Sequence, residues 1–183
     1  MSIKITTLVE NSVYGKGLQG EHGLSLLVDT GEHRLLFDTG ASDLFIRNAR
    51  ILGIDLKEVD FLVLSHGHRD HTGGLHHFLA VNDKAQVICK RELFRPKFKD
   101  ERENGVMQPN ALDSTRFRFV DEVTELCRGV FVFPQLPVTD EEDTHFEHFF
   151  TWTEGRKQAD TFTDELALVL KQGVEVSVLS ACS

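Results

Sequence analysis

Three histidines and one aspartate fall within six residues of this chain, in the segment SHGHRDHTGG at residues 65–74. The candidate residues are His66, His68, Asp70 and His71. Neutral imidazole together with carboxylate is the ligand set that zinc and its first-row neighbours favour. Side chains alternate along extended chain, so His66 and His68 point to the same side and can reach one ion. A turn beyond them, permitted by the glycines of the segment, would bring Asp70 and His71 toward a second ion.

An apolar strand must position this segment. Phe61 to Leu64 is a short, continuous apolar run, which is typical of a strand buried on both faces, and the histidines follow it at once. The end of a strand is also where α/β proteins commonly build their sites. A loop that merely happens to be rich in histidine is the alternative, and the ordered spacing after a buried strand disfavours it.

The rest of the chain predicts a mixed α/β fold. Strand patterns occur at residues 3–9, 24–28, 34–37, 86–89, 116–120 and 130–133, and helical spacing occurs at 43–52 and 73–81. Glu165 to Leu170 and Val174 to Leu179 predict a hairpin with its turn at Gln172-Gly173. The acidic, aromatic stretch from Asp140 to Asp160 predicts a loop or short helix.

Length and composition indicate one domain, residues 1–183, of a cytoplasmic protein. The net charge is −9 and the hydrophobic fraction 40%, which disfavours both a nucleic-acid binder and a disordered chain. Cys89, Cys127 and Cys182 are too few and too far apart for a disulfide framework or a cysteine zinc site. No run of about 18 apolar residues predicts a membrane span.

The histidine segment resembles the signature of the metallo-β-lactamase superfamily, and Leu36-Phe37-Asp38-Thr39-Gly40 resembles its other early motif. The resemblance implies an αββα sandwich. It also implies that His66 and His68 bind one metal ion and that Asp70 and His71 bind the second, with Asp38 holding a ligand histidine from behind. Zn²⁺ is the expected ion, in one or two copies, with Mn²⁺ or Fe²⁺ as alternatives. Asp70 is the expected proton acceptor when no second ion is bound.

Further motifs resemble one branch, the 7,8-dihydropterin-6-ylmethyl-4-(β-D-ribofuranosyl)aminobenzene 5′-phosphate synthases. They are Glu10-Asn11, Glu21 to Ser25, Asn48-Ala49, Asp60 and Asp164 to Leu168. This likeness implies formation of a C–N bond between a pterin and an aminobenzene ribosyl phosphate. Glu21, His22 and Arg69 are then candidate substrate contacts, and the substrate is a small anionic or heterocyclic molecule.

Two alternatives to the synthase remain open. One is a metal-dependent hydrolase of small esters, lactones or thioesters, and the other is an inactive metal-binding fragment. The fragment is considered because the branch continues its last strand into a ligand histidine, whereas this chain ends Ser180-Ala181-Cys182-Ser183. We therefore expect the C-terminal part of the sandwich, with one ligand for each ion, to be missing here, and expect weak metal binding and pairing with another copy.

A histidine pair and a strip of basic residues are two further candidates for binding roles. His145 and His148 have a spacing that could bind metal on one helical face, although their aromatic neighbours favour an amphipathic lid. A basic strip, which could attract an anionic substrate but more often is a solvated face, is formed by Lys90, Arg91, Arg95, Lys97, Lys99 and Arg102.

Overall fold

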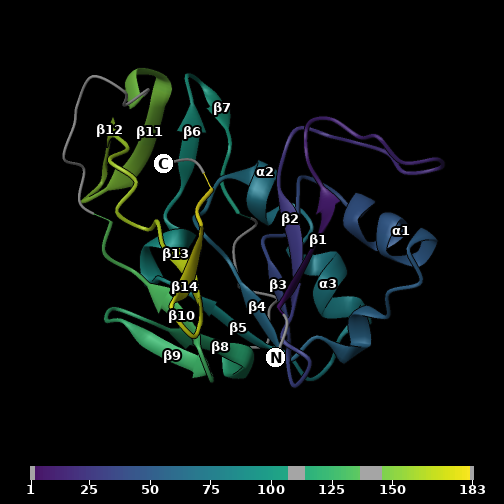
Figure 1. Cartoon of the computed structure of the whole chain (residues 1–183). Helices are drawn as coiled ribbons and strands as arrows, with labels where there is room; N and C mark the ends of the chain where they lie inside the picture. Colours follow the sequence, from purple (N-terminus) through teal and green to yellow (C-terminus); the bar gives the residue numbers. More distant parts are fainter. Residues whose placement is uncertain (1–2, 107–113, 137–145, 182–183) are drawn as a thin grey trace.

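Two β-sheets face each other in the computed structural model, and α-helices cover the outer side of the first sheet (Figure 1). The structure describes residues 3–106, 114–136 and 146–181. The first sheet has the strand order β1-β2-β3-β4-β5-β8, and the second has the order β14-β13-β10-β9. A third, smaller sheet with the order β12-β11-β6-β7 projects beside them on the side of α2 (Figure 1).

The strands of the first sheet are β1 (Lys4–Val9), β2 (Ser25–Asp29), β3 (Arg34–Phe37), β4 (Phe61–Val63), β5 (Gln86–Cys89) and β8 (Phe117–Phe119). The second sheet comprises β9 (Thr124–Cys127), β10 (Val130–Phe133), β13 (Ala167–Gln172) and β14 (Glu175–Leu179). The third comprises β6 (Lys97–Lys99), β7 (Arg102–Glu103), β11 (Phe149–Thr153) and β12 (Arg156–Ala159). The α-helices are α1 (Leu44–Ile51), α2 (Arg69–Thr72) and α3 (Leu75–Val81). Short 3₁₀ turns are η1 (Leu56–Glu58), η2 (Arg91–Phe94), η4 (Ser114–Arg116) and η5 (Phe146–His148).

The central strands β3, β4 and β5 of the first sheet are apolar on both faces, as their continuous hydrophobic runs predict. Leu36 and Leu62 face the helices and pack in one cluster with Phe45 and Phe78. Their neighbours along the strands point the other way, toward Leu168 and the rest of the second sheet, in a second cluster. The mixed α/β prediction is therefore confirmed, with an α/β/β order of layers in the described residues.

The third sheet shows that one prediction was wrong. The segment expected to be a loop or short helix up to Asp160 instead contains β11 and β12, paired from Phe150 with Ala159 to Thr153 with Arg156. The turn between them is Glu154-Gly155, and both residues have positive φ angles of 53° and 77°. Two consecutive positive φ values are the mark of the tight hairpin turn whose twist matches its strands.

The remaining predicted elements are present, with ends shifted by one to a few residues. The helix expected at 73–81 is α3, and the chain makes an extra helical turn, α2, immediately before it. None of the helices in the described ranges is long and apolar enough to cross a bilayer.

Candidate metal centre

The histidine segment leaves the end of β4 and is held by Asp38, which follows β3. Asp38 is fully buried and has a φ of 60°, a left-handed conformation that aspartate tolerates better than most residues. The parallel pairing of β3 with β4 places the ends of the two strands side by side. The carboxylate of Asp38 therefore lies directly behind the histidines.

Asp38 fixes the ring orientation of two histidines. Its Oδ1 accepts the Ser65 N–H at 2.7 Å, and its Oδ2 lies 2.8 Å from His71 Nδ1. The Ser65 hydroxyl donates to the same Oδ2 at 2.7 Å and lies 2.9 Å from His66 Nδ1. A carboxylate only accepts, so His71 carries its proton on Nδ1, and the serine oxygen in turn receives the Nδ1 proton of His66. Nε2 of His66 is thereby left with a lone pair, the form in which histidine binds a metal.

His66 is the best evidence that a ligand is needed here. Its side chain is fully buried, and Nε2 has no hydrogen-bond partner within the described residues. Burial, together with the neighbouring His71, His68 and Lys97, holds the pKa of His66 well below its usual value, so the ring is neutral. A buried polar atom without a partner costs about 1–3 kcal/mol, which coordination of an ion would remove.

The four predicted ligands lie together. The His66 ring is 4.7 Å from that of His68 and 4.4 Å from that of His71, centre to centre. Asp70 Oδ2 is 3.5 Å from His71 Nε2 and 3.3 Å from His22 Nε2. Burial raises the pKa of Asp70, but hydrogen bonding to His71 outweighs it and the net shift is downward, so the carboxylate is ionised near neutrality.

The candidate metal ligands approach one another two at a time. Among residues 3–106, 114–136 and 146–181, no three His, Cys, Asp or Glu side chains are arranged so that they could hold one ion together. The donor chemistry nevertheless fits a divalent first-row ion, because imidazoles and carboxylates lie around the buried His66 nitrogen that has no partner within the described residues. Coordination by His66, His68, Asp70 and His71 stays a prediction.

A buried charge cluster flanks the loop on the side of the third sheet. Lys97 Nζ lies 2.6 Å from Asp160 Oδ2 and 2.9 Å from Asp164 Oδ1, and all three side chains are at most 3% exposed. Asp164 Oδ2 accepts the Gly67 N–H at 2.7 Å. A side chain on Gly67 would meet the Leu93 carbonyl at 2.3 Å, so this position needs glycine. Asp164 thus holds the backbone between the two histidines.

Asp160 continues this cluster toward the histidines. Its Oδ2 lies 3.6 Å from His68 Nε2. Burial raises the pKa of Asp160, but the His68 hydrogen bond and the Lys97 charge outweigh it and lower the pKa to about 2. The Phe149 and Phe162 rings pack 4.8 Å and 4.9 Å from the His68 ring.

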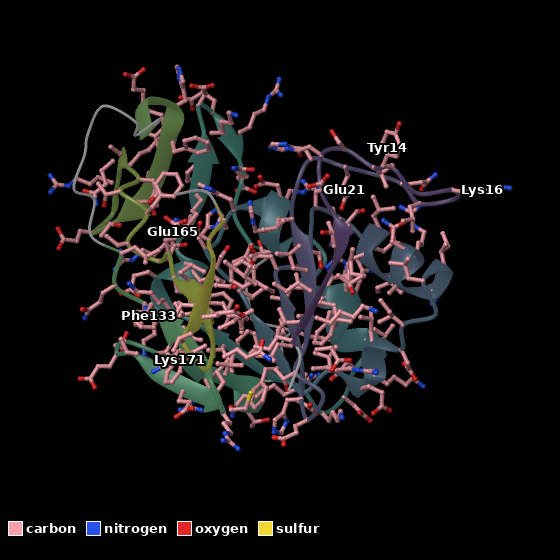
Figure 2. The ribbon with its side chains drawn as sticks, viewed as in Figure 1. Tyr14, Lys16, Glu21, Phe133, Glu165 and Lys171 are labelled. Atoms are coloured by element: carbon pink, nitrogen blue, oxygen red, sulfur yellow. The ribbon has the colours of Figure 1, made fainter. Side chains whose placement is uncertain are left out.

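The candidate substrate contacts lie in different surroundings. His22 is exposed and borders Asp70, as expected of a residue that lines the site. Glu21, in the loop between β1 and β2 that also carries Tyr14 and Lys16 (Figure 2), uses its carboxylate to accept the Ala41 and Ser42 N–H groups at 3.0 and 3.1 Å. Arg69 begins α2 and is exposed.

The residues of the basic strip and the two downstream histidines also differ in their surroundings. Lys97 is buried, so interpretation of the whole basic strip as a solvated face is wrong at that position, whereas Lys99 and Arg102 are exposed. His148 is 68% exposed and bonds to Asp100 at 3.1 Å. His145 and Cys182 lie outside the described residues.

Sequence reasoning missed the part of the site that comes from the third sheet. It gave no role to Asp160 or Phe162, placed Lys97 only in the basic strip and Phe149 only among the aromatic neighbours of His145 and His148, and included Asp164 only as part of a branch motif. An indirect indication of this part of the site was Asp164. It directly precedes the apolar strand β13, and an aspartate next to such a strand needs a polar partner.

Comparison with known families agrees with this geometry. A family model described as the metallo-beta-lactamase superfamily matches residues 18–164, which include Asp38, the histidine segment and Asp160. The chain belongs to the metallo-beta-lactamase superfamily. The resemblance of the histidine segment and of the Asp38 motif to this superfamily is thereby confirmed.

Relatives within the superfamily include two proteins of one archaeon. The chain is 28% identical, over 204 residues, to the 7,8-dihydropterin-6-methyl-4-(beta-D-ribofuranosyl)-aminobenzene-5'-phosphate synthase of Methanocaldococcus jannaschii, with 100% of this chain and 68% of that protein covered. It is also 28% identical over 172 residues to protein MJ0448 of the same archaeon, with 91% and 66% covered. The chain thus spans about two thirds of the length of these relatives.

Solved structures share the fold. The crystal structure of Tm1679, described as a metal-dependent hydrolase of the beta-lactamase superfamily, superposes with a TM-score of 0.76 and 31% identity, covering 98% of this chain and 65% of its own. The metallo-beta-lactamase MIM-1 of Novosphingobium pentaromativorans, at 18% identity and a TM-score of 0.53, covers 86% of this chain and 54% of its own. At that identity the likeness concerns the fold alone.

Proposed function

We propose that this chain is a metal-dependent enzyme of the superfamily that acts on a small anionic or heterocyclic substrate. Zn²⁺ is the proposed ion, in one or two copies, with Mn²⁺ or Fe²⁺ as alternatives; His66 and His68 would hold one ion, and Asp70 and His71 a second. The observation that carries the proposal is the buried Nε2 of His66, which has no hydrogen-bond partner within the described residues while Ser65, itself held by Asp38, contacts Nδ1 of the same ring. A buried imidazole nitrogen that lacks a partner is unfavourable unless a ligand binds it.

A bound divalent ion supplies a Lewis acid that polarises a carbonyl or phosphoryl oxygen and makes water more acidic. The chain's own groups do the rest. When no second ion is bound, the ionised carboxylate of Asp70, which is 20% exposed, can take a proton from the attacking group. Phe149 offers an apolar ring beside His68, and the Lys99 ammonium lies 5.3 Å from the centre of that ring. A substrate with a flat ring and a negatively charged group would fit here, with its ring against Phe149 and its charge near the Lys99 ammonium.

For the reaction, we favour formation of a C–N bond between a pterin and an aminobenzene ribosyl phosphate. The support is the named archaeal relative, which matches along the whole of this chain. In this reaction the site would orient two substrates, so that a nucleophile on one displaces a leaving group from the other while Asp70 accepts the proton that is released.

Hydrolysis of small esters, lactones or thioesters is the second candidate. The likeness to Tm1679 favours it, because that protein is described as a hydrolase and matches 98% of this chain, though only 65% of its own, at 31% identity. The same ligands and the same proton acceptor would serve, with water as the nucleophile.

Metal analysis combined with a substrate panel tests the proposal. We expect the chain to bind added Zn²⁺, weakly because ligands are expected to be missing, and with the ion in excess to turn over either the pterin pair or an ester, lactone or thioester. His66→Ala should abolish both metal binding and turnover, whereas His76→Ala, which changes an exposed imidazole on α3, should leave both intact. A chain that binds no added divalent ion, or a His66→Ala variant that behaves like the wild type, would overturn the proposal.

A further inference from the structure

Phe162 has a backbone conformation that an aromatic residue rarely adopts. Its φ angle is 53°, in the left-handed region where a bulky side chain crowds its own backbone. Among the non-glycine residues that the structure describes, the others with a positive φ are Asp38, Asp100 and Glu154. Aspartate tolerates this region, and Glu154 occupies the tight turn between β11 and β12. Phe162 has neither reason, so its backbone is strained.

Hydrogen bonds on both sides of the residue hold this conformation. The Phe162 N–H donates to Asp160 Oδ1 at 3.0 Å, and the Phe162 carbonyl accepts the Glu165 N–H at 2.9 Å. Asp160 is itself fixed, because the Lys97 ammonium donates to its Oδ2 at 2.6 Å and both side chains are at most 3% exposed. A strained residue persists only where its surroundings determine its conformation in this way, and such residues cluster at functional sites.

The strained backbone places the Phe162 ring beside the histidines. The centre of this ring is 4.9 Å from that of His68 and 6.1 Å from that of His66. The Phe149 ring approaches the His68 ring at 4.8 Å and lies 5.6 Å from the Phe162 ring. Both phenylalanines are half-buried, so together they form an aromatic wall that stays accessible beside the candidate metal ligands.

We propose that Phe162 is a specificity-determining residue, because its ring and that of Phe149 form the wall against which a flat ring of the substrate stacks. This inference rests on the proposed function and deepens it, since it assigns recognition of an aromatic or heterocyclic substrate to two named side chains. Aromatic rings attract one another in stacked and edge-on arrangements beyond what their buried area alone provides. The fold keeps a strained backbone at Phe162 because that backbone places the ring where the substrate binds.

Paired substitutions at Phe162 test the strain. Phe162→Ala and Phe162→Gly both remove the ring and differ by a single Cβ atom. At an ordinary φ the alanine variant is the more stable of the two, whereas at a left-handed φ the glycine variant is. Thermal unfolding should therefore give Phe162→Gly a melting temperature roughly 2–4 °C above that of Phe162→Ala.

Thr161 provides the matched control, because it is the exposed neighbour of Phe162 and its φ is not positive. Here Thr161→Gly should melt below Thr161→Ala. If glycine melts below alanine at Phe162 as well, Phe162 is not strained and the inference is overturned.

Binding of matched probes tests the role of the ring. Phenylphosphonate and cyclohexylphosphonate carry the same anionic group on rings of similar size, and of the two rings the phenyl ring is the flat, aromatic one. Isothermal titration calorimetry with added Zn²⁺ should show that Phe162→Leu binds phenylphosphonate and a free pterin roughly 5- to 10-fold more weakly than the wild type. Binding of cyclohexylphosphonate should change little, and Phe162→Tyr, which keeps an aromatic ring, should bind all three probes like the wild type.

The outcomes distinguish a failure of this inference from a failure of the proposed function. If the wild-type chain binds neither Zn²⁺ nor the probes, both fail. If it binds Zn²⁺ but neither the pterin nor phenylphosphonate, or if Phe162→Leu binds these two as well as the wild type does, only the inference fails. An equal loss of Zn²⁺ affinity in Phe162→Leu would show that the ring acts on His68 and not on the substrate, which also overturns the assignment. Should Phe162→Leu not fold, Phe149→Leu decides, and undiminished binding of phenylphosphonate by that variant would overturn the proposed wall.

Discussion

Replacing Asp38 with asparagine should separate the folding of the site from its affinity for metal. Asparagine tolerates the left-handed backbone at this position, where φ is 60°, and it keeps one oxygen to accept the Ser65 N–H. The substitution changes the other side-chain oxygen, Oδ2 of Asp38. An oxygen that accepts from His71 and from the Ser65 hydroxyl becomes an NH₂ that donates.

This change should reverse the protonation of His66. The new NH₂ would donate to Ser65 Oγ, whose hydroxyl would then turn toward His66 Nδ1, 2.9 Å away, and move the ring proton to Nε2. It would also face His71 Nδ1, whose proton Asp38 accepts in the wild type. His66 Nε2 would become a donor and lose the lone pair that an ion requires.

The magnitudes follow from the three hydrogen bonds that Asp38 accepts from these groups. A hydrogen bond to a charged group contributes about 1.5–3 kcal/mol and a neutral one about 0.5–1.5 kcal/mol. Three bonds weakened by about 1 kcal/mol each predict a loss of about 3 kcal/mol in the free energy of unfolding. Metal affinity should fall by roughly 10- to 100-fold or more, as for other groups that orient a ligand histidine.

Urea unfolding gives the first quantity, and zinc competition with a chromogenic chelator gives the second. Asp43→Asn is the matched control, because Asp43 is half-exposed and its ion pair with Arg47 lies outside the site. It should change neither quantity appreciably. Zinc affinity within about twofold of wild type in a folded Asp38→Asn variant would refute the assignment of the histidine protons to Asp38.

Three further predictions concern other buried groups. Asn48→Ala should lower the free energy of unfolding by about 3 kcal/mol in urea, since this 2% exposed side chain makes three hydrogen bonds to backbone groups at 2.7–3.1 Å. Burial raises the pKa of the Cys89 thiol to about 12, so iodoacetamide at pH 8 should not label Cys89 until the chain unfolds, and rapid labelling of the native chain would contradict this. Burial raises the pKa of Asp60, but the Arg34 N–H and the Lys84 charge outweigh it and leave the pKa below its ordinary value of 3.8. Asp60 therefore stabilises the fold above about pH 4 and ceases to do so as pH falls further, so acid titrations of Asp60→Asn and wild type should differ at pH 7 and converge at low pH.

The first sheet and the histidine segment could be predicted because their signals are local. Phe61 to Leu64 is apolar at every position, and strands β3, β4 and β5 are buried on both faces as such runs predict. His66 and His68 share a side through simple alternation, and Asp38 was indicated by its motif. Each of these inferences needs only a few neighbouring residues.

The third sheet could not be predicted in the same way, because it depends on contacts between residues that are far apart in the sequence. Lys97 looks like any lysine in a charged run, and only the approach of Asp160 and Asp164, more than 60 residues later, makes its burial favourable. The β11–β12 hairpin was missed because its strands follow an acidic stretch and mix charged with aromatic residues. Its turn, Glu154-Gly155, was a usable signal that the composition of the region obscured.

The histidine segment is anchored to both sheets, and this links metal binding to the packing between them. Asp38, from the first sheet, holds Ser65, and the Ser65 carbonyl accepts the N–H of Leu166 at 2.9 Å, just before the strand β13 of the second sheet. Asp164, on the same approach to β13, holds Gly67. An ion that binds only this assembled loop stabilises the folded chain by about 2.7 kcal/mol when its free concentration is about 100 times its dissociation constant. Because the linkage is reciprocal, a change in the core between the sheets that populates the unassembled loop weakens metal binding, even when it touches none of the ligands.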